Sequence, residues 1–324
     1  MALYIEAASF LIEANMRWKR GQRLKLVSET DAPSPSRAIL REVRQSLGVP
    51  AVPRLYQAYA AFPEFLQLHW QSFRPAVESR QFFVLGSRLA AESYTRAHNY
   101  FEIRPLPRPE ASKPSSALFQ VPQVLDYYQY LDPLLLLIAA AQMQAFEGPV
   151  GQQARESGAA SHPEFAVAPC LLRDDQASAD VQRSWAERKR YSELAFVSDE
   201  HRALAYWPDF YLPYWAALKE LLRSPVYADC QYRLADSALE MTSELPVRVE
   251  TGILQLLDAD LDDDQVTSVM RINEVFLQAL TGLVLDITFA RIGCEDGTPT
   301  EKTPHKNPVS EPSAHKTGSP VRAA

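Results

Sequence analysis

Cysteine is scarce in this chain of 324 residues, and the three copies (Cys170, Cys230 and Cys294) lie far apart. They form no Cys-x-x-Cys pair and no Cys/His ligand spacing, so we expect reduced thiols in a cytoplasmic protein and no metal site. Glycine is also scarce, at 11 residues. The sequence contains no G-x-S-x-G, P-loop, G-x-G-x-x-G or H-E-x-x-H pattern, so several common classes of hydrolase, nucleotide-binding protein and metalloprotease lack their usual signature.

An excess of positive charge is missing too, because the net charge is −7. Nucleic acids and anionic membranes bind concentrated basic surfaces, so neither is expected as a partner, whereas a small anionic substrate needs only a local cation or dipole. The most apolar stretch, 133–141, is shorter than the roughly 20 residues that span a bilayer, and it predicts a buried core helix. At the N-terminus, Glu6 and Glu13 interrupt the apolar positions. Segment 1–28 therefore predicts an amphipathic helix and not a signal peptide.

Proline, in contrast, is common, with 24 copies that often separate segments whose apolar residues recur at helical spacing. No segment has a convincing strand pattern. Apolar residues make up 47% of the chain, which is enough for a large core. We therefore predict an all-α fold with helices at 37–47, 54–73 (stopped by Pro75), 76–101, 121–146 (a helix pair or one long helix kinked around Pro133), 178–192, 200–223, 226–243 and 264–290.

An internal repeat organises these helices. The segment FPEFLQLHW at 62–70 matches WPDFYLPYW at 207–215, so that Pro63 aligns with Pro208 and Trp70 with Trp215. Later segments follow in the same order. The repeat predicts two helical units packed as an intrachain pseudo-dimer, since each unit needs a partner to bury its apolar faces. The predicted boundaries are a first unit at 29–146, a linker at 147–177, a second unit at 178–293 and a disordered tail at 294–324.

The two copies differ where this helix begins: the first reads VPRLY at 52–56 and the second VSDEH at 197–201. Ser198, Asp199 and Glu200 are typical of a helix N-terminus. Alternatively, Asp199 projects between the copies as a general base whose pKa is raised by desolvation. His201 could line the same opening, although a surface position is favoured.

Two further acidic features stand out. Asp132 precedes Pro133 and a wholly apolar run, so it is either a helix cap or a polar group aimed into a cavity. The acidic segment 258–265 has the start of a calcium-loop spacing, but Asp263 and Val269 occupy positions that need glycine and glutamate. We therefore interpret this segment as an acidic helix N-terminus.

Taken together, the tandem helical copies, the "VP" entry, the Ser-Asp pair and the Asp-Pro-x-Leu-Leu-Leu helix resemble the group I haloacid dehalogenases, which are DL-2-haloacid dehalogenases. The resemblance covers about residues 30–290. It implies a pseudo-dimer within each chain, a homodimer of chains, and hydrolysis of both enantiomers of 2-haloacids without a cofactor or a covalent ester. In that family an Asp activates the water that displaces halide with inversion, and an Asn helps to hold the water.

Carried over by position, the resemblance gives Asp199 as the base, with Ser198 beside it, and places Asp132 at the Asn position. The remaining pocket positions fall on Leu135, Phe276 and Leu280 and near Val52 and Leu55. An amide donates and accepts hydrogen bonds, whereas an ionised carboxylate only accepts them. Either Asp132 is protonated and mimics the amide, or the substrate differs, or dehalogenation has been lost. The function implied is hydrolytic dehalogenation of short 2-haloalkanoic acids; the alternative is a non-catalytic or diverged small-molecule-binding protein of the same fold.

Overall fold

A computed structural model describes residues 24–107, 120–152, 158, 163, 165, 167–192, 194 and 196–295. Within these ranges the backbone forms helices, and its one β-type pairing is an isolated bridge between Val150 and Val249. The elements are α2 (Ser34–Ser46), α3 (Arg54–Tyr59), α4 (Pro63–Val77), α5 (Arg80–Tyr100), α6 (Val121–Glu147), α7 (Ala179–Arg188), α8 (Asp199–Leu204), α9 (Pro208–Leu222), α10 (Pro225–Met241), the 3-10 helix η1 (Thr242–Glu244), α11 (Ile253–Asp258) and α12 (Asp263–Cys294). The predicted all-α fold is confirmed.

Local capping explains where several of these helices begin. The side-chain oxygens of Ser79, Ser178 and Ser224 accept hydrogen bonds from backbone amides three residues further on, at the starts of α5, α7 and α10. At the start of α12, Asp262 and Gln265 form a reciprocal capping box. Each cap satisfies a backbone amide that has no partner inside the helix. The acidic helix N-terminus predicted at 258–265 is therefore confirmed.

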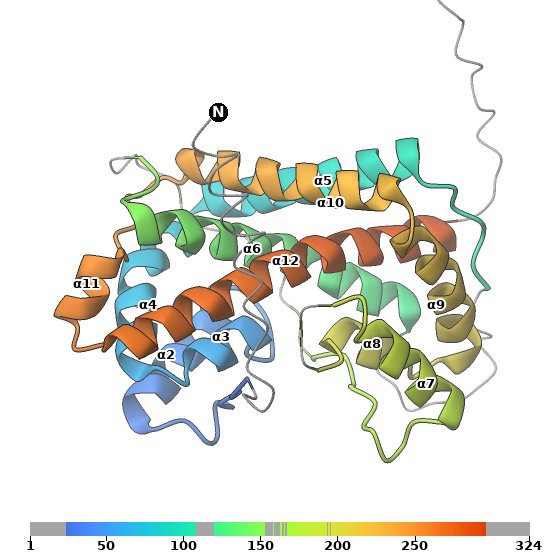
Figure 1. Cartoon of the computed structure of the whole chain (residues 1–324), viewed down its shortest axis with the longest axis horizontal. Helices are drawn as coiled ribbons and strands as arrows, with labels where there is room; N and C mark the ends of the chain where they lie inside the picture. The colour runs from blue at the N-terminus through green and yellow to red at the C-terminus, as the bar shows by residue number, and fades with distance from the viewer. Residues whose placement is uncertain are drawn as a thin grey trace, which may run out of the picture.

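The long helices α6 and α12 form the centre of the molecule, where they pack against each other more extensively than any other pair. Both are continuously buried over their most apolar segments, 131–141 and 279–290. By length and composition α12 could cross a membrane, but 83% of its apolar window is buried inside the protein, as in a core helix. Helices α5 and α10 lie side by side across one side of this centre, while α2–α4 and α7–α9 occupy opposite ends (Figure 1).

Four consecutive helices recur at equal spacing along the chain. Helices α2, α3, α4 and α5 begin at residues 34, 54, 63 and 80, and α7, α8, α9 and α10 begin 145 residues later, at 179, 199, 208 and 225. One side-chain contact recurs with them: the indole of Trp70 donates to Glu42 at 2.9 Å, and that of Trp215 donates to Glu187 at 3.1 Å. The short helices cross over, since α3 packs on α12 and α8 packs on α6. The pseudo-dimer itself stays a prediction.

Several predicted boundaries were wrong. The segments 54–73 and 200–223 are each divided into two helices. In each segment a new helix begins at a proline, α4 at Pro63 and α9 at Pro208, because proline suits the first position of a helix. Pro75 does not stop its helix but lies in the last turn of α4, and α11 was not predicted. Of the predicted N-terminal helix 1–28, residues 1–23 lie outside the described residues and 24–28 are not helical. The predicted disordered tail lies outside them too, apart from Cys294, which ends α12, and Glu295.

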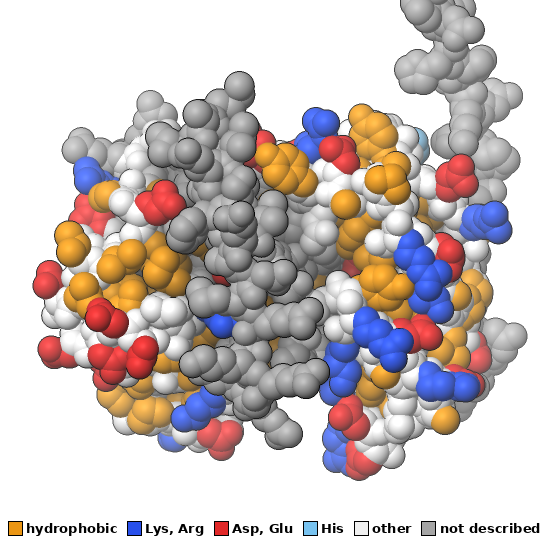
Figure 2. Space-filling view, viewed as in Figure 1, with side chains coloured by type: hydrophobic (Ala, Val, Ile, Leu, Met, Phe, Trp, Pro, Cys, Tyr) orange, Lys and Arg blue, Asp and Glu red, His pale blue; other side chains and the backbone are white. Residues whose placement is uncertain are grey.

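Charged side chains of both signs lie on the face shown in Figure 2. Acidic side chains gather over α11 and the start of α12 at one end, and many of the Lys and Arg side chains lie over α7 and α9 at the other. On the described part of this face, neither sign forms a continuous band across the molecule.

Candidate functional site

A small cavity of about 40 Å³ lies where α3, α6, α8 and α12 meet, with the segment before α8 as a further wall. Its polar lining comes from the N-terminal ends of α3 and α8 and from the middle of α6. The wall that α12 contributes is apolar. The lining residues are Pro53, Arg54, Leu55, Tyr128, Leu131, Asp132, Leu135, Leu194, Phe196, Ser198, Asp199, Glu200, Phe276, Leu280 and Leu283.

The residues predicted for the site come together at this cavity, with one exception. Asp199, Asp132, Ser198, Leu135, Phe276, Leu280 and Leu55 all line it. Val52 is buried outside the lining, one residue before Pro53. Residues distant in sequence meet here because α8 packs on α6 and α3 packs on α12. The roles of these residues stay predictions.

Asp199 is held in a bidentate ion pair with Arg54. The Arg54 Nε lies 2.9 Å from Oδ1 and 3.1 Å from Oδ2, and its Nη2 lies 2.8 Å from Oδ1. The two side chains are 30% and 21% exposed, so the pair lies at the edge of the cavity and not in its depth. Burial alone would lower the pKa of Arg54, but the charge of Asp199 and its hydrogen bonds raise it above its ordinary value. The strongly desolvated carboxyls are therefore Asp132 and Glu200 rather than Asp199.

Asp132 and Glu200 form a buried carboxyl pair, 1% and 7% exposed. Burial raises the pKa of Asp132 well above its usual range, and the neighbouring Glu200 charge raises it further. Burial and the charge of Asp199 raise the pKa of Glu200 to about 7. If both carboxyls were ionised, neither Asp132 oxygen nor Oε2 of Glu200 would have a hydrogen-bond donor among the described residues. A proton on Asp132 provides that donor, and an interaction with protonated Asp132 lowers the pKa of Glu200 again.

The Ser198 hydroxyl adds a further polar atom to the cavity. Ser198 is the N-cap residue of α8, as the sequence predicted, but its side chain does not cap the helix. Its Oγ is buried and has no hydrogen bond of normal geometry within the described ranges, although its proximity lowers the pKa of Glu200. A hydroxyl that is not used by its own helix is free to bind a water or a ligand.

Glu200 was missed as a site residue because it was interpreted as a first-turn acid. The spacing of 145 residues that relates α3 to α8 places Glu200 opposite Leu55, which is fully buried. An acid that replaces an apolar residue on the buried face of a repeated helix is the signal that could have identified it.

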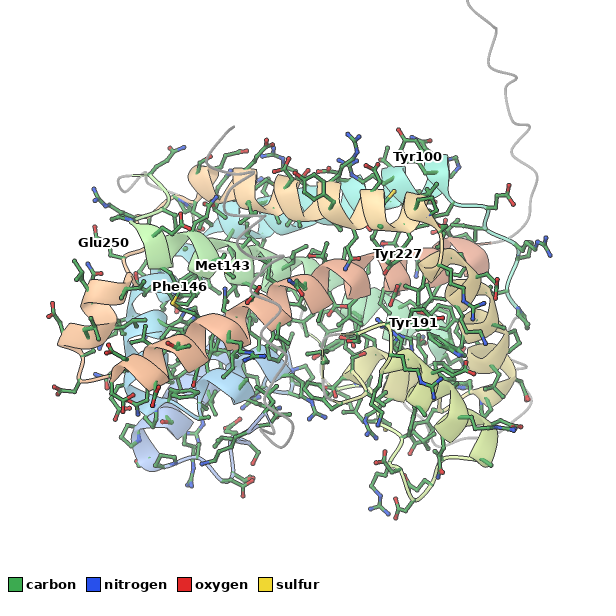
Figure 3. The ribbon with its side chains drawn as sticks, viewed as in Figure 1. Tyr100, Met143, Phe146, Tyr191, Tyr227 and Glu250 are labelled. Carbon is green, nitrogen blue, oxygen red and sulfur yellow. The ribbon has the colours of Figure 1, made fainter. Side chains whose placement is uncertain are left out.

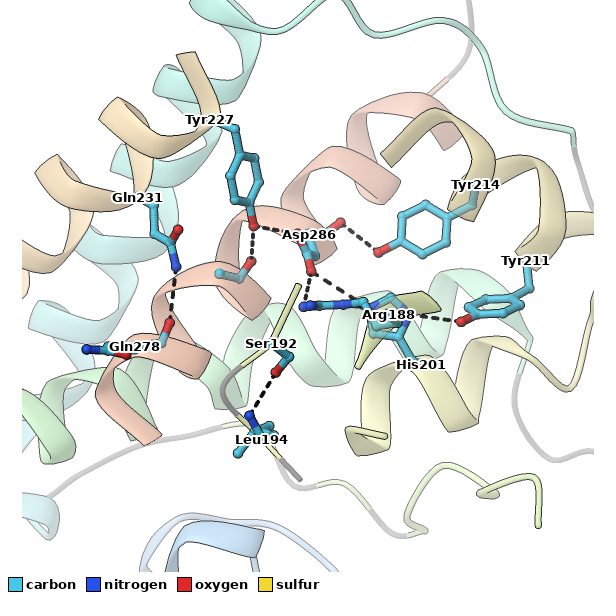
Figure 4. A network of polar contacts seen from close by, with 11 residues as sticks. Arg188, Ser192, Leu194, His201, Tyr211, Tyr214, Tyr227, Gln231, Gln278 and Asp286 are labelled. Carbon is cyan, nitrogen blue, oxygen red and sulfur yellow. Dashed lines mark hydrogen bonds and ion pairs between the residues drawn. The ribbon is translucent and has the colours of Figure 1, made fainter. Parts of the chain in front are cut away.

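His201 is not at the surface, contrary to the prediction, because its side chain is only 1% exposed. The Nε of Arg188 donates to His201 Nε2 at 3.0 Å, so Nε2 is the acceptor and the ring is neutral, with its proton on Nδ1 toward Tyr211. Burial lowers the pKa of His201, which agrees with this neutral form. The network continues to Asp286, which accepts from Arg188 Nη2 at 2.8 Å and from the hydroxyl of Tyr227 at 2.7 Å (Figure 4).

This network lies beside the cavity and has a structural character. Tyr227 projects from α10 toward α12 (Figure 3), so the network joins α7, α8, α10 and α12. Burial opposes the ionisation of Asp286, but Arg188 and the surrounding hydrogen bonds keep its pKa below its usual value. Within the described ranges, no three His, Cys, Asp or Glu side chains are grouped so that they could hold a metal ion.

Comparison with known proteins gives consistent results. A family model described as "Halocarboxylic acid dehydrogenase DehI" matches residues 50–201, which include Arg54, Asp132 and the start of α8. An (R)-2-haloacid dehalogenase of Pseudomonas putida is 23% identical over 273 residues, covering 82% of this chain and 91% of that protein. These matches support a haloacid dehalogenase-like family for this chain.

A second relative and a solved structure are similar to this chain as well. An (R)-2-haloacid dehalogenase of Rhizobium sp. (strain NHG3) is 22% identical over 209 residues, covering 63% of this chain and 81% of that protein. The solved structure of a D-2-haloacid dehalogenase mutant in complex with D-2-CPA has the same fold, with a TM-score of 0.76 and 22% identity over 85% of this chain and 97% of that one. These relatives are named for the (R) or D enantiomer, whereas the resemblance in the sequence implied action on both.

Proposed function

We propose that this protein hydrolyses short 2-haloalkanoic acids and releases halide from the α-carbon. The observation that carries the proposal is the set of carboxyl groups around one apolar-walled cavity, where Asp132, Asp199 and Glu200 meet in a chain similar to the haloacid dehalogenases. A cavity at this position offers both a proton acceptor and shelter from bulk water.

In the proposed reaction Asp199 accepts a proton from a water molecule while the water oxygen attacks the α-carbon. The carbon–halogen bond breaks as the carbon–oxygen bond forms, and the halide leaves with the bonding electron pair. The products are a 2-hydroxy acid, a halide ion and a proton. A volume of about 40 Å³ is enough for one or two ordered waters, which need a few polar partners each. Protonated Asp132 and the Ser198 hydroxyl are suitable partners, and Asp132 then both donates and accepts as an amide does.

A haloacid is larger than this cavity, so substrate binding requires movement of its wall. The apolar side chains of Leu135, Phe276 and Leu280 surround the space, and they offer a non-polar environment to the halogen. We place the site at the seam of a pseudo-dimer, because α3 and α8 hold equivalent positions in the two series of helices, and α6 and α12 are the long helices that come after each series. A cytoplasmic homodimer of such chains is part of the same proposal, and light scattering of the purified protein tests the dimer.

Halide release from each enantiomer of 2-chloropropionate tests the proposal. We expect chloride from the (R) enantiomer, as the names of the relatives suggest, and measurement of the (S) enantiomer tests the broader prediction. Asp199→Asn should reduce the rate of chloride release by roughly 100- to 10,000-fold, which is the contribution of a general base. Its circular dichroism spectrum should be unchanged. Asp209→Asn, which changes an exposed first-turn acid on α9, serves as the control. Absence of chloride release by the wild type from either enantiomer, between pH 6 and pH 10, would refute the proposal.

A second candidate is a non-catalytic or diverged small-molecule-binding protein of the same fold. It is favoured by the ion pair that engages both carboxylate oxygens of Asp199, since both oxygens already accept hydrogen bonds from Arg54. This candidate predicts that the wild type binds propionate, the halogen-free analogue, and yet releases no halide.

A further inference from the structure

We propose that Arg54 binds the carboxylate of the substrate by exchanging partners, leaving Asp199 for the substrate and so freeing Asp199 to act as the base. This inference rests on the proposed function and assigns a role to Arg54, which holds in α3 the position that Asp199 holds in α8. It accounts for a base that is neutralised by an ion pair before the substrate arrives.

The charges around the cavity point to Arg54. Each haloacid carries a carboxylate, yet the ionisable side chains that α6 and α8 contribute to the lining are the carboxyls of Asp132, Asp199 and Glu200 and the Tyr128 hydroxyl, and none of them is a cation. Helix α12 contributes apolar side chains alone to the lining. Among the described residues that line the cavity, Arg54, at the start of α3, is the single Lys or Arg. Within this part of the chain it is therefore the cation that an entering anion meets.

The geometry of Arg54 suits this role. Its guanidinium already binds the Asp199 carboxylate through Nε and Nη2, at 2.8 to 3.1 Å. A planar guanidinium presents a fork that matches any carboxylate, so a substrate carboxylate can replace that of Asp199 without loss of hydrogen bonds to Arg54. Arg54 is 30% exposed and its guanidinium carbon lies 5.4 Å from the centre of the Phe196 ring, so it lies at the rim where an incoming ligand reaches it first.

The exchange also prepares Asp199 for proton transfer. Once Arg54 has turned to the substrate, the Asp199 carboxylate no longer has its cation and stands beside the buried Glu200. The two Asp199 oxygens, which accept from Arg54 in the ion pair, are then free to accept a hydrogen bond and a proton from the attacking water. Substrate binding and activation of the base are thereby coupled.

Binding of two matched probes to the full chain tests this role. Propionate carries the carboxylate of the substrate without the halogen, and propionamide is its neutral analogue. By calorimetry, we expect Arg54→Gln to weaken propionate binding by about 10- to 100-fold and to leave propionamide binding unchanged. Arg54→Lys keeps the positive charge but loses the bidentate geometry, so its affinity for propionate should lie between those of the wild type and Arg54→Gln. Arg202 lies on α8 outside the cavity and forms an ion pair with Asp174. Arg202→Gln removes this pair, and it should change the affinity for neither propionate nor propionamide.

Three outcomes would overturn the assignment: unchanged propionate affinity in Arg54→Gln, an equal loss for both probes, or no propionate binding by the wild type. If Arg54→Gln does not fold, as judged by circular dichroism, the same comparison is made with Arg54→Lys. Chloride release separates this assignment from the proposed function. Release with a KM for 2-chloropropionate that is unchanged in Arg54→Gln refutes the role of Arg54 alone. Arg54-dependent propionate binding without any chloride release supports Arg54 and refutes the dehalogenase.

Discussion

Replacing Glu200 by glutamine should make the protein more stable at high pH and hardly alter it at low pH. The change removes a carboxyl that is 7% exposed, and it keeps the size of the side chain. Burial and the charge of Asp199 raise the pKa of Glu200 from 4.5 to about 7. A shift of this size corresponds to roughly 3 kcal/mol of free energy, because each pKa unit is worth about 1.4 kcal/mol.

The sign follows from which state holds the proton. Below pH 4.5 Glu200 is protonated in both the folded and the unfolded chain, so the two proteins respond alike to pH. Between pH 4.5 and about 7 the unfolded chain loses this proton while the folded chain keeps it, so the wild type loses stability as the pH rises. Above pH 7 the loss is complete. Glutamine does not titrate. The free energy of unfolding of Glu200→Gln, relative to that of the wild type, should therefore rise by about 3 kcal/mol between pH 4.5 and pH 8.

Urea denaturation followed by circular dichroism at pH 5, 6, 7 and 8 measures this difference. Burial is the largest cause of the raised pKa of Asp132, but Glu200 contributes to it, so the difference reports the loss of Glu200 together with its effect on Asp132. Glu220→Gln, at an exposed position on α9, is the control and should change the free energy of unfolding by less than about 0.5 kcal/mol at each pH. A difference between Glu200→Gln and the wild type that stays constant from pH 5 to pH 8 would refute the reasoning.

Two further predictions concern the other buried charges. Asp132→Asn supplies an amide that donates and accepts at every pH, so kcat/KM for 2-chloropropionate should stay within about tenfold of the wild type at pH 6 and exceed it once a rising pH ionises Asp132 in the wild type. If Asp132→Asn is as inactive as Asp199→Asn, the proposed similarity between protonated Asp132 and an amide is wrong. Arg188→Met leaves the Asp286 carboxylate buried without its cation and should lower the free energy of unfolding by about 3–5 kcal/mol, measured by urea denaturation. The double variant Arg188→Met/Asp286→Leu should recover part of this loss, and a double variant no more stable than the single one would contradict the argument.

Much of the helical framework was accessible from the sequence because it depends on nearby residues. Helical periodicity predicted every long helix, and the proline at each helix start is visible in the segments at 62–70 and 207–215. The errors are also local. The sequence predicts that Pro75 stops its helix, whereas Pro75 lies in the last turn of α4, and the sequence does not predict the breaks before α4 and α9. Proline ends or begins a helix according to its surroundings, which a single sequence does not specify.

The site was accessible in part. The broken symmetry between 52–56 and 197–201 drew attention to Asp199, and the polar residue ahead of an apolar run drew attention to Asp132. Both line one cavity in the structure. The burial of Glu200 and His201 was missed, since an acid and a histidine in a first helical turn are usually exposed.

By itself, the sequence determined the helices, their order and their spacing of 145 residues, because backbone hydrogen bonds, caps and apolar periodicity act over a few residues. Only the tertiary structure decided that Arg54 and Asp199, which are equivalent positions at that spacing, pair with each other, and that Asp132 meets Glu200. Such contacts depend on how α3 and α8 lie against α12 and α6, and no local pattern specifies which charge faces which. The pKa values that govern the proposed chemistry follow from these contacts and from burial, so they too belong to the folded chain.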